Sequence, residues 1–123
     1  RVKLKMKNTG EDPYKVSCAL HTYLSLGAIE RIQLEGVNGS HYVDMLSDCD
    51  ATIYQEKNLQ IKGELDRIYQ SMASVLIRDL DRFRSVCIDK AGSRSTVIWS
   101  PWIEKTMALA ERLDNAYKEF VCV

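Results

Sequence analysis

The amino-acid sequence predicts an all-β protein. Short runs rich in β-branched and aromatic residues recur along the 123 residues, and turn-forming residues separate them at short intervals. Only residues 103–113, IEKTMALAERL, combine good helix formers with an absence of Gly and Pro, and this segment predicts one short helix. One helix among many strands does not change the fold class. The residues by themselves leave a sandwich and a closed barrel open.

The predicted strands follow from these runs. Their ranges are 1–7, 14–26, 30–37, 51–55, 58–63, 73–79, 82–89, 95–99 and 117–123. Gly, Pro, Asn and Asp residues favour turns in the segments between them, at 8–13, 38–40 and 91–93. Residues 64–72 are compatible with either a helix or a strand.

The sequence also predicts a tight turn, the end of one strand, and strand-like segments at both ends of the given residues. Leu80-Asp81 predicts a hairpin between the strands that flank it, and Pro101 ends the STVIWS strand. Strand-like alternation runs from Arg1, and the YKEFVCV segment stays strand-like as far as Val123. We therefore expect the chain to be a piece of a longer domain.

The charge balance limits the classes of partner. Seventeen basic and seventeen acidic residues cancel, so no single-signed field attracts nucleic acid or an anionic membrane surface. No stretch approaches the roughly 20 apolar residues that span a bilayer. The sequence predicts neither a nucleic-acid nor a membrane partner, and a small ligand fits better.

The four cysteines indicate the redox compartment. Cys18, Cys49, Cys87 and Cys122 are widely spaced, with no C-x-x-C pair and no histidine spacing typical of a zinc site. We expect reduced, mostly buried thiols in a cytosolic compartment rather than disulfides.

His21 is the first candidate for chemistry. Period-two alternation within 14–26 predicts that Val16, Cys18, Leu20, Leu24 and Leu26 face the core, while His21 and Tyr23 share the other face with small residues. An imidazole can give or take a proton near neutral pH. A purely structural strand histidine is the alternative. His41, next to a turn, is expected to be solvated.

Two further segments carry candidate ligand contacts. Asp66 in GELDRIY could accept hydrogen bonds from sugar hydroxyls, or it could form a surface ion pair with a neighbouring arginine. Trp99 in VIWSPW could stack on a sugar ring, or it could belong to the core. The sequence contains no phosphate-binding glycine loop, no G-x-S-x-G elbow and no H-E-x-x-H, which argues against nucleotide-dependent, serine-hydrolase and zinc-protease chemistry.

Several short motifs occur together in one order. They are Ala19-Leu20-His21-Thr22-Tyr23, Leu34-Glu35-Gly36-Val37 with Tyr42-Val43-Asp44, Asp66-Arg67-Ile68-Tyr69, Val97-Ile98-Trp99-Ser100-Pro101-Trp102, and Tyr117-Lys118 through Val121-Cys122-Val123. This order resembles the hexose-6-phosphate mutarotases, or glucose-6-phosphate 1-epimerases, of the aldose 1-epimerase superfamily. The resemblance covers the C-terminal half to two-thirds of the family's domain. It implies that residues 1–123 form a single incomplete domain, part of a large galactose-mutarotase-like β-sandwich.

The resemblance also implies an activity and its residues. The expected enzyme is a cytosolic isomerase that interconverts the α and β anomers of glucose 6-phosphate and needs no metal or nucleotide cofactor, with a plastid location also open. By matching motifs, His21 is the acid at the ring oxygen, and Asp66, Tyr23, Trp99 and Ser100 are the substrate contacts. Ser100 stands where the family usually has asparagine, and serine has a shorter reach and no amide donors.

The same resemblance implies that important parts lie outside these residues. The family's glutamate base directly follows the element matched by Val121-Cys122-Val123, and its phosphate-binding arginines lie upstream of Arg1. We therefore expect residues 1–123 to be inactive alone, with a missing N-terminal portion or another chain completing the sandwich. A non-catalytic mutarotase-like subunit, used for sugar-phosphate binding or as a scaffold, is the alternative.

Overall fold

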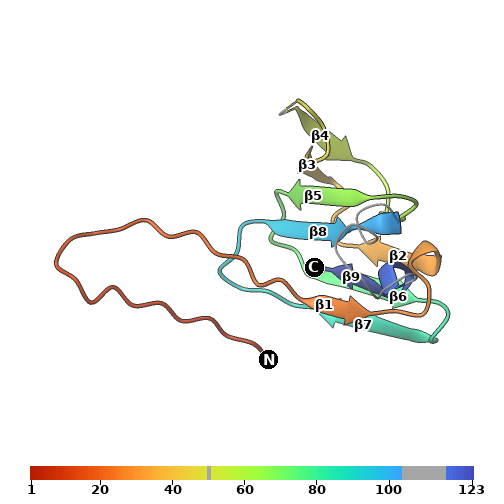
Figure 1. Ribbon diagram of the computed structural model, residues 1–123, viewed down its shortest axis with the longest axis horizontal. Coiled ribbons are helices and arrows are strands. Elements are labelled where there is room, and N and C mark those ends of the chain that lie inside the picture. Colours follow the sequence, from red (N-terminus) through yellow and green to blue (C-terminus); the bar gives the residue numbers. More distant parts are fainter. Residues whose placement is uncertain (50, 104–115) are drawn as a thin grey trace.

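Two antiparallel sheets lie face to face in the computed structural model, which describes residues 1–49, 51–103 and 116–123 (Figure 1). The strands are β1 (Tyr23–Ser25), β2 (Ile32–Glu35), β3 (Ser40–Asp44), β4 (Thr52–Gln55), β5 (Leu65–Tyr69), β6 (Val75–Asp79), β7 (Arg84–Ile88), β8 (Thr96–Ser100) and β9 (Phe120–Cys122). Two short 3₁₀ helices, η1 (Ile29–Arg31) and η2 (Ala116–Glu119), precede β2 and β9. The all-β prediction is confirmed, and the arrangement is a sandwich.

The strand order shows how distant segments meet. One sheet has six strands in the order β1-β9-β8-β5-β3-β4, and the other has three in the order β2-β6-β7. In Figure 1 the six-stranded sheet runs from β4 at the top to β1 at the bottom. Because β9 lies between β1 and β8, the C-terminal strand joins the segment around Tyr23 to the segment around Trp99.

Alternation along the strands places the core between the sheets. In β8 the buried residues Thr96, Ile98 and Ser100 alternate with half-buried Val97 and Trp99. Strands β2 and β6 show the same period of two, which directs every second side chain inward. The buried apolar cluster consists of Leu26, Ile29, Ile32, Leu34, Val37, Tyr42, Leu59, Ile61, Leu65, Tyr69, Val75, Ile77, Ile98 and Val121.

The predicted hairpin at Leu80-Asp81 is present, and β6 pairs with β7. The buried carboxylate of Asp79 fixes the position of this hairpin. The Asp79 oxygens accept hydrogen bonds from the Gly27 N–H at 3.2 and 3.3 Å and from the Arg84 side chain at 3.3 Å. The approach at Gly27 requires glycine, because a Cβ there would lie 2.4 Å from Asp81 Cβ. Asp79 thus holds the segment after β1 against the three-stranded sheet.

The N-terminal strand predictions are largely wrong. Residues 1–22 form no regular element and are exposed, and Figure 1 shows them as a long loop that extends away from the sheets. Only 23–25 of the predicted strand 14–26 form a strand. Val16 and Leu20, expected in the core, are each more than half exposed, whereas Leu26 is buried. The alternation is real, but residues 1–21 pair with no strand of the described part of the chain, and only the Thr22 carbonyl continues the pairing, by accepting a hydrogen bond from the Val123 N–H.

Other differences are smaller. Residues 65–69 form a strand, which settles the ambiguity of 64–72, and residues 40–44 form a strand that the sequence pattern did not predict. Residues 58–63 contribute only an isolated bridge between Leu34 and Leu59. The helix predicted over 103–113 lies, from residue 104 on, outside the described residues.

The cysteine prediction is half right. All four thiols are free, but Cys18, Cys49 and Cys87 are exposed and only Cys122 is buried. Among the residues that the structure describes, no helix is both long enough and apolar enough to cross a membrane.

Candidate functional site

A row of side chains crosses four neighbouring strands on the outward face of the six-stranded sheet. Tyr23 is opposite Cys122, Cys122 is opposite Trp99, and Trp99 is opposite Asp66. Residues directly opposite each other in antiparallel strands share a face. The inward residues of the same strands, such as Ile98, belong to the core, so this row points away from the three-stranded sheet.

The aromatic side chains of this face gather around His21. The His21 ring lies 5.0 Å from the Tyr23 ring and 5.6 Å from the Trp99 ring, measured between centroids. Phe120 adds a fourth ring, 5.3 Å from Tyr23 and 6.2 Å from Trp99. We call His21, Tyr23, Trp99 and Phe120 the ring cluster. Tilted and edge-on ring pairs at these separations are favourable contacts.

His21 belongs to the ring cluster although it does not lie in a strand, which differs from the prediction based on alternation. The residue is exposed and precedes β1 rather than lying within a strand. Its neighbour Thr22 accepts a backbone hydrogen bond of 3.2 Å from the Val123 N–H, which continues the pairing of β1 with β9. The C-terminal residues therefore hold the chain at 22 against the sheet and direct the imidazole over its outward face.

A small cavity lies beside the imidazole. It has a volume of about 60 Å³ and is lined by Ala19, Leu20, His21, Val97, Trp99, Cys122 and Val123. Ligand pockets typically measure about 300–1,000 Å³. The cavity is therefore much smaller than a typical ligand pocket. A larger hollow of about 460 Å³ lies on the other sheet, away from His21.

Cys122 lies in the floor of this face. The residue is only 3% exposed, and burial raises the pKa of its thiol to about 12. A thiol with so high a pKa stays protonated at neutral pH and is a poor nucleophile. Cys122 therefore supplies an apolar floor beneath the rings and not a reactive group.

The structure brings together four of the five predicted site residues. His21, Tyr23 and Trp99 are in mutual ring contact, and Asp66 is half-buried on the same face, on the strand next to Trp99. Ser100 is different, because it is fully buried and points inward opposite Leu65. Its role in binding substrate remains a prediction, and its hydroxyl has no hydrogen-bond partner among the described residues.

The arginine that follows Asp66 in the sequence, Arg67, pairs with Asp44. The Arg67 side chain lies 3.2 Å from Asp44, and its guanidinium covers the Tyr42 ring at 4.4 Å. Tyr69 donates a hydrogen bond of 3.1 Å to the side chain of Gln55, and burial raises the pKa of the Tyr69 hydroxyl. This group stabilises the β3-β5 pairing at the other end of the sheet.

Phe120 and Cys122 are the members of this face that sequence reasoning missed. Both lie on β9, and alternation alone shows only that they share a face. Their position between β1 and β8 depends on strand order, which no local pattern encodes. The described residues hold no group of three or more His, Cys, Asp or Glu side chains suited to a metal ion.

The all-β sandwich thus presents an imidazole, a carboxylate and aromatic rings on one face of its six-stranded sheet. The family model described as Aldose 1-epimerase matches residues 1–123, so the chain belongs to the aldose 1-epimerase family.

Individual relatives agree with this assignment. A protein from Cenchrus ciliaris, named "Putative glucose-6-phosphate 1-epimerase", is 28% identical over 97% of this chain and 37% of its own length. A protein of the same name from Escherichia coli strain K12 is 24% identical over 98% of this chain and 40% of its own length. The chain thus spans about two-fifths of the length of these curated relatives.

Proposed function

We propose that the protein containing this chain is a hexose-6-phosphate mutarotase, which interconverts the α and β anomers of glucose 6-phosphate and similar sugars. The observation that carries the proposal is the position of His21, an exposed imidazole next to Tyr23 and Trp99 at the edge of a cavity. Membership of the aldose 1-epimerase family supports the reaction class. The names of the relatives support the substrate.

The proposed reaction needs two proton transfers. A base takes the proton from the C1 hydroxyl while His21, in its protonated form, gives a proton to the ring oxygen. The C1–O5 bond breaks as its electron pair moves to O5, and the O–H electron pair forms the C1 carbonyl. Rotation about C1–C2 presents the opposite face of the carbonyl. Reclosure reverses both transfers, so His21 recovers its proton and the cycle is balanced.

The other residues of this face would position the sugar. Asp66, a half-buried carboxylate, would accept hydrogen bonds from sugar hydroxyls. The Trp99 and Tyr23 rings would present apolar surface to the C–H groups of the pyranose. Ser100 is the remaining proposed substrate contact, and its hydroxyl is buried on the opposite side of β8 from Trp99. The carboxylate base and the phosphate ligands would come from outside residues 1–123, from the rest of the polypeptide or from another chain.

The test of this mechanism uses the complete gene product and the rate of glucose 6-phosphate anomerisation, followed by exchange NMR. A positioned acid typically contributes about 10²–10⁴ in rate, so His21→Ala should lose a factor of that order. His41→Ala is the matched control, because His41 is also an exposed imidazole in contact with a tyrosine, 5.1 Å from Tyr54. Equal rates for the two variants would remove His21 from the mechanism.

A non-catalytic sugar-phosphate-binding or scaffold protein is the second candidate. The observation that favours it is the small volume of the cavity beside His21, about 60 Å³, against about 300–1,000 Å³ for typical ligand pockets. The intact mass of the polypeptide and the residue after Val123 separate the two. A glutamate at that position and basic residues upstream of Arg1 would favour the enzyme, whereas an apolar residue there and no upstream half would favour the scaffold.

A further inference from the structure

His21 lies just before the first paired residues of β1. The chain is tied to the sheet at the next residue, where the Val123 N–H donates a hydrogen bond of 3.2 Å to the Thr22 carbonyl. The imidazole itself is exposed and lies in ring contact with Tyr23, at 5.0 Å, and with Trp99, at 5.6 Å. The direction of the imidazole therefore depends on where these two rings are held.

Phe120 contacts both of these rings. Its ring centroid lies 5.3 Å from that of Tyr23 and 6.2 Å from that of Trp99, and the Tyr23 and Trp99 rings are 6.4 Å apart. Tyr23 and Trp99 thus each contact both His21 and Phe120. Among the described residues, Phe120 and His21 make no ring contact with each other. An effect of Phe120 on the imidazole would therefore pass through the two rings between them.

The backbone that carries Phe120 is held on both sides. Strand β9 lies between β1 and β8, and the Leu26 N–H donates a hydrogen bond of 2.6 Å to the carbonyl of Glu119. The next side chain, Val121, is fully buried in the core. Tyr23, by contrast, is 62% exposed and lies on the edge strand β1. Phe120 is therefore the better fixed of the two rings.

We propose that Phe120 is a positioning residue for His21, because it supports the Tyr23 and Trp99 rings that direct the imidazole over the outward face. The kinetic consequence of this role rests on the proposed function. A proton donor acts only within hydrogen-bond reach of the atom that receives the proton. A displacement of about 1 Å can cost about 10²-fold in rate, so packing that locks the donor in place matters for the chemistry.

The first test measures the position of the imidazole and assumes nothing about the reaction. NMR spectra of the histidine ring protons are recorded at one pH for the complete gene product and for its Phe120→Leu and Phe120→Tyr variants. His21→Ala and His41→Ala assign the two signals. Because nearby aromatic rings shift proton resonances, Phe120→Leu should move the His21 signals toward those of a solvated histidine. Phe120→Tyr keeps the ring and should leave them close to their original positions.

His41 is the internal control for this measurement. It is the other histidine of residues 1–123, it is also exposed, and its ring lies 5.1 Å from Tyr54. Its signals should not move in either variant. Phe120 is half-buried and lies outside the buried apolar cluster, so Phe120→Leu is expected to fold. Unmoved His21 signals in Phe120→Leu, or equal displacement in both variants, would overturn the proposal.

The second test is the rate of glucose 6-phosphate anomerisation. Phe120→Leu should lower kcat about tenfold or more and change KM by less than about twofold, because a displaced acid slows the chemical step without weakening substrate binding. Phe120→Tyr should restore most of kcat. A raised KM with unchanged kcat would make Phe120 a substrate contact and would contradict the positioning role.

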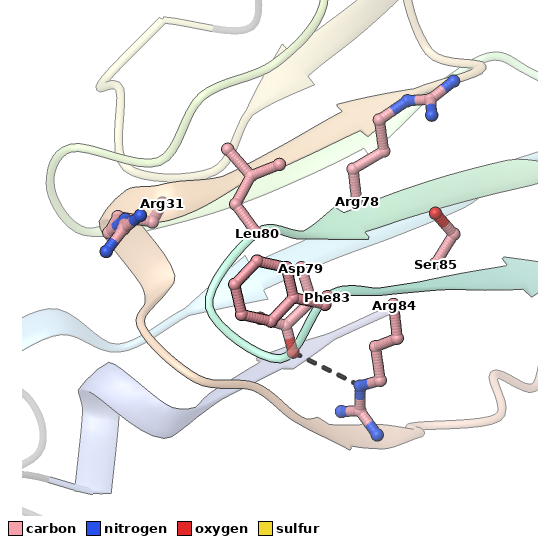
Figure 2. A pocket seen from close by; sticks show the side chains of 7 residues that line it. All are labelled: Arg31, Arg78, Asp79, Leu80, Phe83, Arg84 and Ser85. Atoms are coloured by element: carbon pink, nitrogen blue, oxygen red, sulfur yellow. Dashed lines mark hydrogen bonds and ion pairs between the residues drawn. The ribbon is translucent and has the colours of Figure 1, made fainter.

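Phe83→Leu is the matched control, since Phe83 is the other phenylalanine of the chain. Figure 2 shows it at the turn of the β6-β7 hairpin, on the other sheet, and it is 96% exposed. This variant should change neither the His21 signals nor kcat, and a loss equal to that of Phe120→Leu would refute a specific role of the ring cluster. Failure of the proposed function is seen separately, as a full rate in His21→Ala, and the NMR comparison then still decides whether Phe120 positions the imidazole.

Discussion

The outward faces of the two sheets use their polar and aromatic residues in opposite ways. On the six-stranded sheet, His21 is in contact with the aromatic rings of Tyr23 and Trp99. On the three-stranded sheet, arginines and carboxylates are paired with each other, as in the contact of Arg78 with Glu35. The six-stranded sheet carries an exposed imidazole beside a small cavity, whereas the three-stranded sheet uses its charged groups in ion pairs between its own residues.

This difference distinguishes polar side chains that could act on a ligand from polar side chains that stabilise the fold. A carboxylate that accepts several hydrogen bonds from its own chain, such as Asp79, is already satisfied and contributes to stability. An imidazole whose neighbours are aromatic rings can still exchange a proton with a ligand. The titratable side chains proposed to act on a substrate, His21 and Asp66, thus lie on the outward face of the six-stranded sheet.

The largest expected effect tests the structural side of this comparison. Asp79→Ala removes the buried acceptor of the Gly27 and Arg82 N–H groups and of the Arg84 side chain. Unsatisfied buried groups of this kind typically cost a few kcal/mol, so we expect the free energy of unfolding to fall by about 2–3 kcal/mol. Urea denaturation followed by circular dichroism measures this change.

Asp81→Ala is the control for that measurement. Asp81 pairs with Arg31, whose side chain is 65% exposed, and solvent screens the interaction. The expected loss is at most about 1 kcal/mol. If the two variants were equally stable, Asp79 would be no more than another surface charge, and the contrast between the two faces would fail.

A second prediction compares one thiol from each sheet. Cys122 lies beneath the ring cluster, and its thiol has a pKa of about 12 rather than 9.0. Cys87 is exposed, and the pKa of its thiol is raised by partial desolvation and by the neighbouring Asp89 carboxylate. Thiolate is the reactive form, and its fraction rises with pH toward the pKa. Alkylation of Cys122 should therefore be slowest and should increase only at strongly alkaline pH.

Cys49 provides the positive control for the thiol measurement. A hydrogen bond with Ser47 and another with the backbone at Ala51 lower the pKa of Cys49, so its thiolate forms at lower pH and it should react first. Peptide mass spectrometry after timed alkylation gives the order. Rapid labelling of Cys122 in the folded chain would show that the face beneath the rings is open.

The smallest expected effect concerns Ser100. Its side chain points into the interior, on the opposite side of β8 from Trp99. Ser100→Ala should change the free energy of unfolding by less than about 1 kcal/mol, because the hydroxyl makes no hydrogen bond among the described residues. In the complete gene product, an unchanged KM for glucose 6-phosphate would assign Ser100 to the core, whereas a large rise would restore it as a substrate contact.

Local patterns predicted the strands that lie wholly within the sandwich. Residues 30–37, 73–79 and 82–89 each contain an observed strand, and 95–99 covers all of β8 except Ser100, because their alternating apolar residues fill the space between the sheets. The same patterning failed for 1–7 and for most of 14–26. A strand needs hydrogen-bonding neighbours as well as alternation, and residues 1–21 pair with no strand of the described part of the chain.

The candidate site was predicted only in part. His21, Tyr23, Asp66 and Trp99 were identified as candidates, but the argument for His21 assumed a strand at 14–22 that does not form. Phe120 was missed because its contacts with Tyr23 and Trp99 come from residues far apart in the sequence.

The sequence by itself determined the all-β class, the β6-β7 hairpin and the residue types available for acid–base chemistry. These depend on periodicity, turn residues and side-chain chemistry, which are local properties. Only the tertiary structure decided which of these residues meet. The insertion of β9 between β1 and β8 is a long-range pairing, and it alone brings an imidazole from residue 21 within reach of the indole of residue 99.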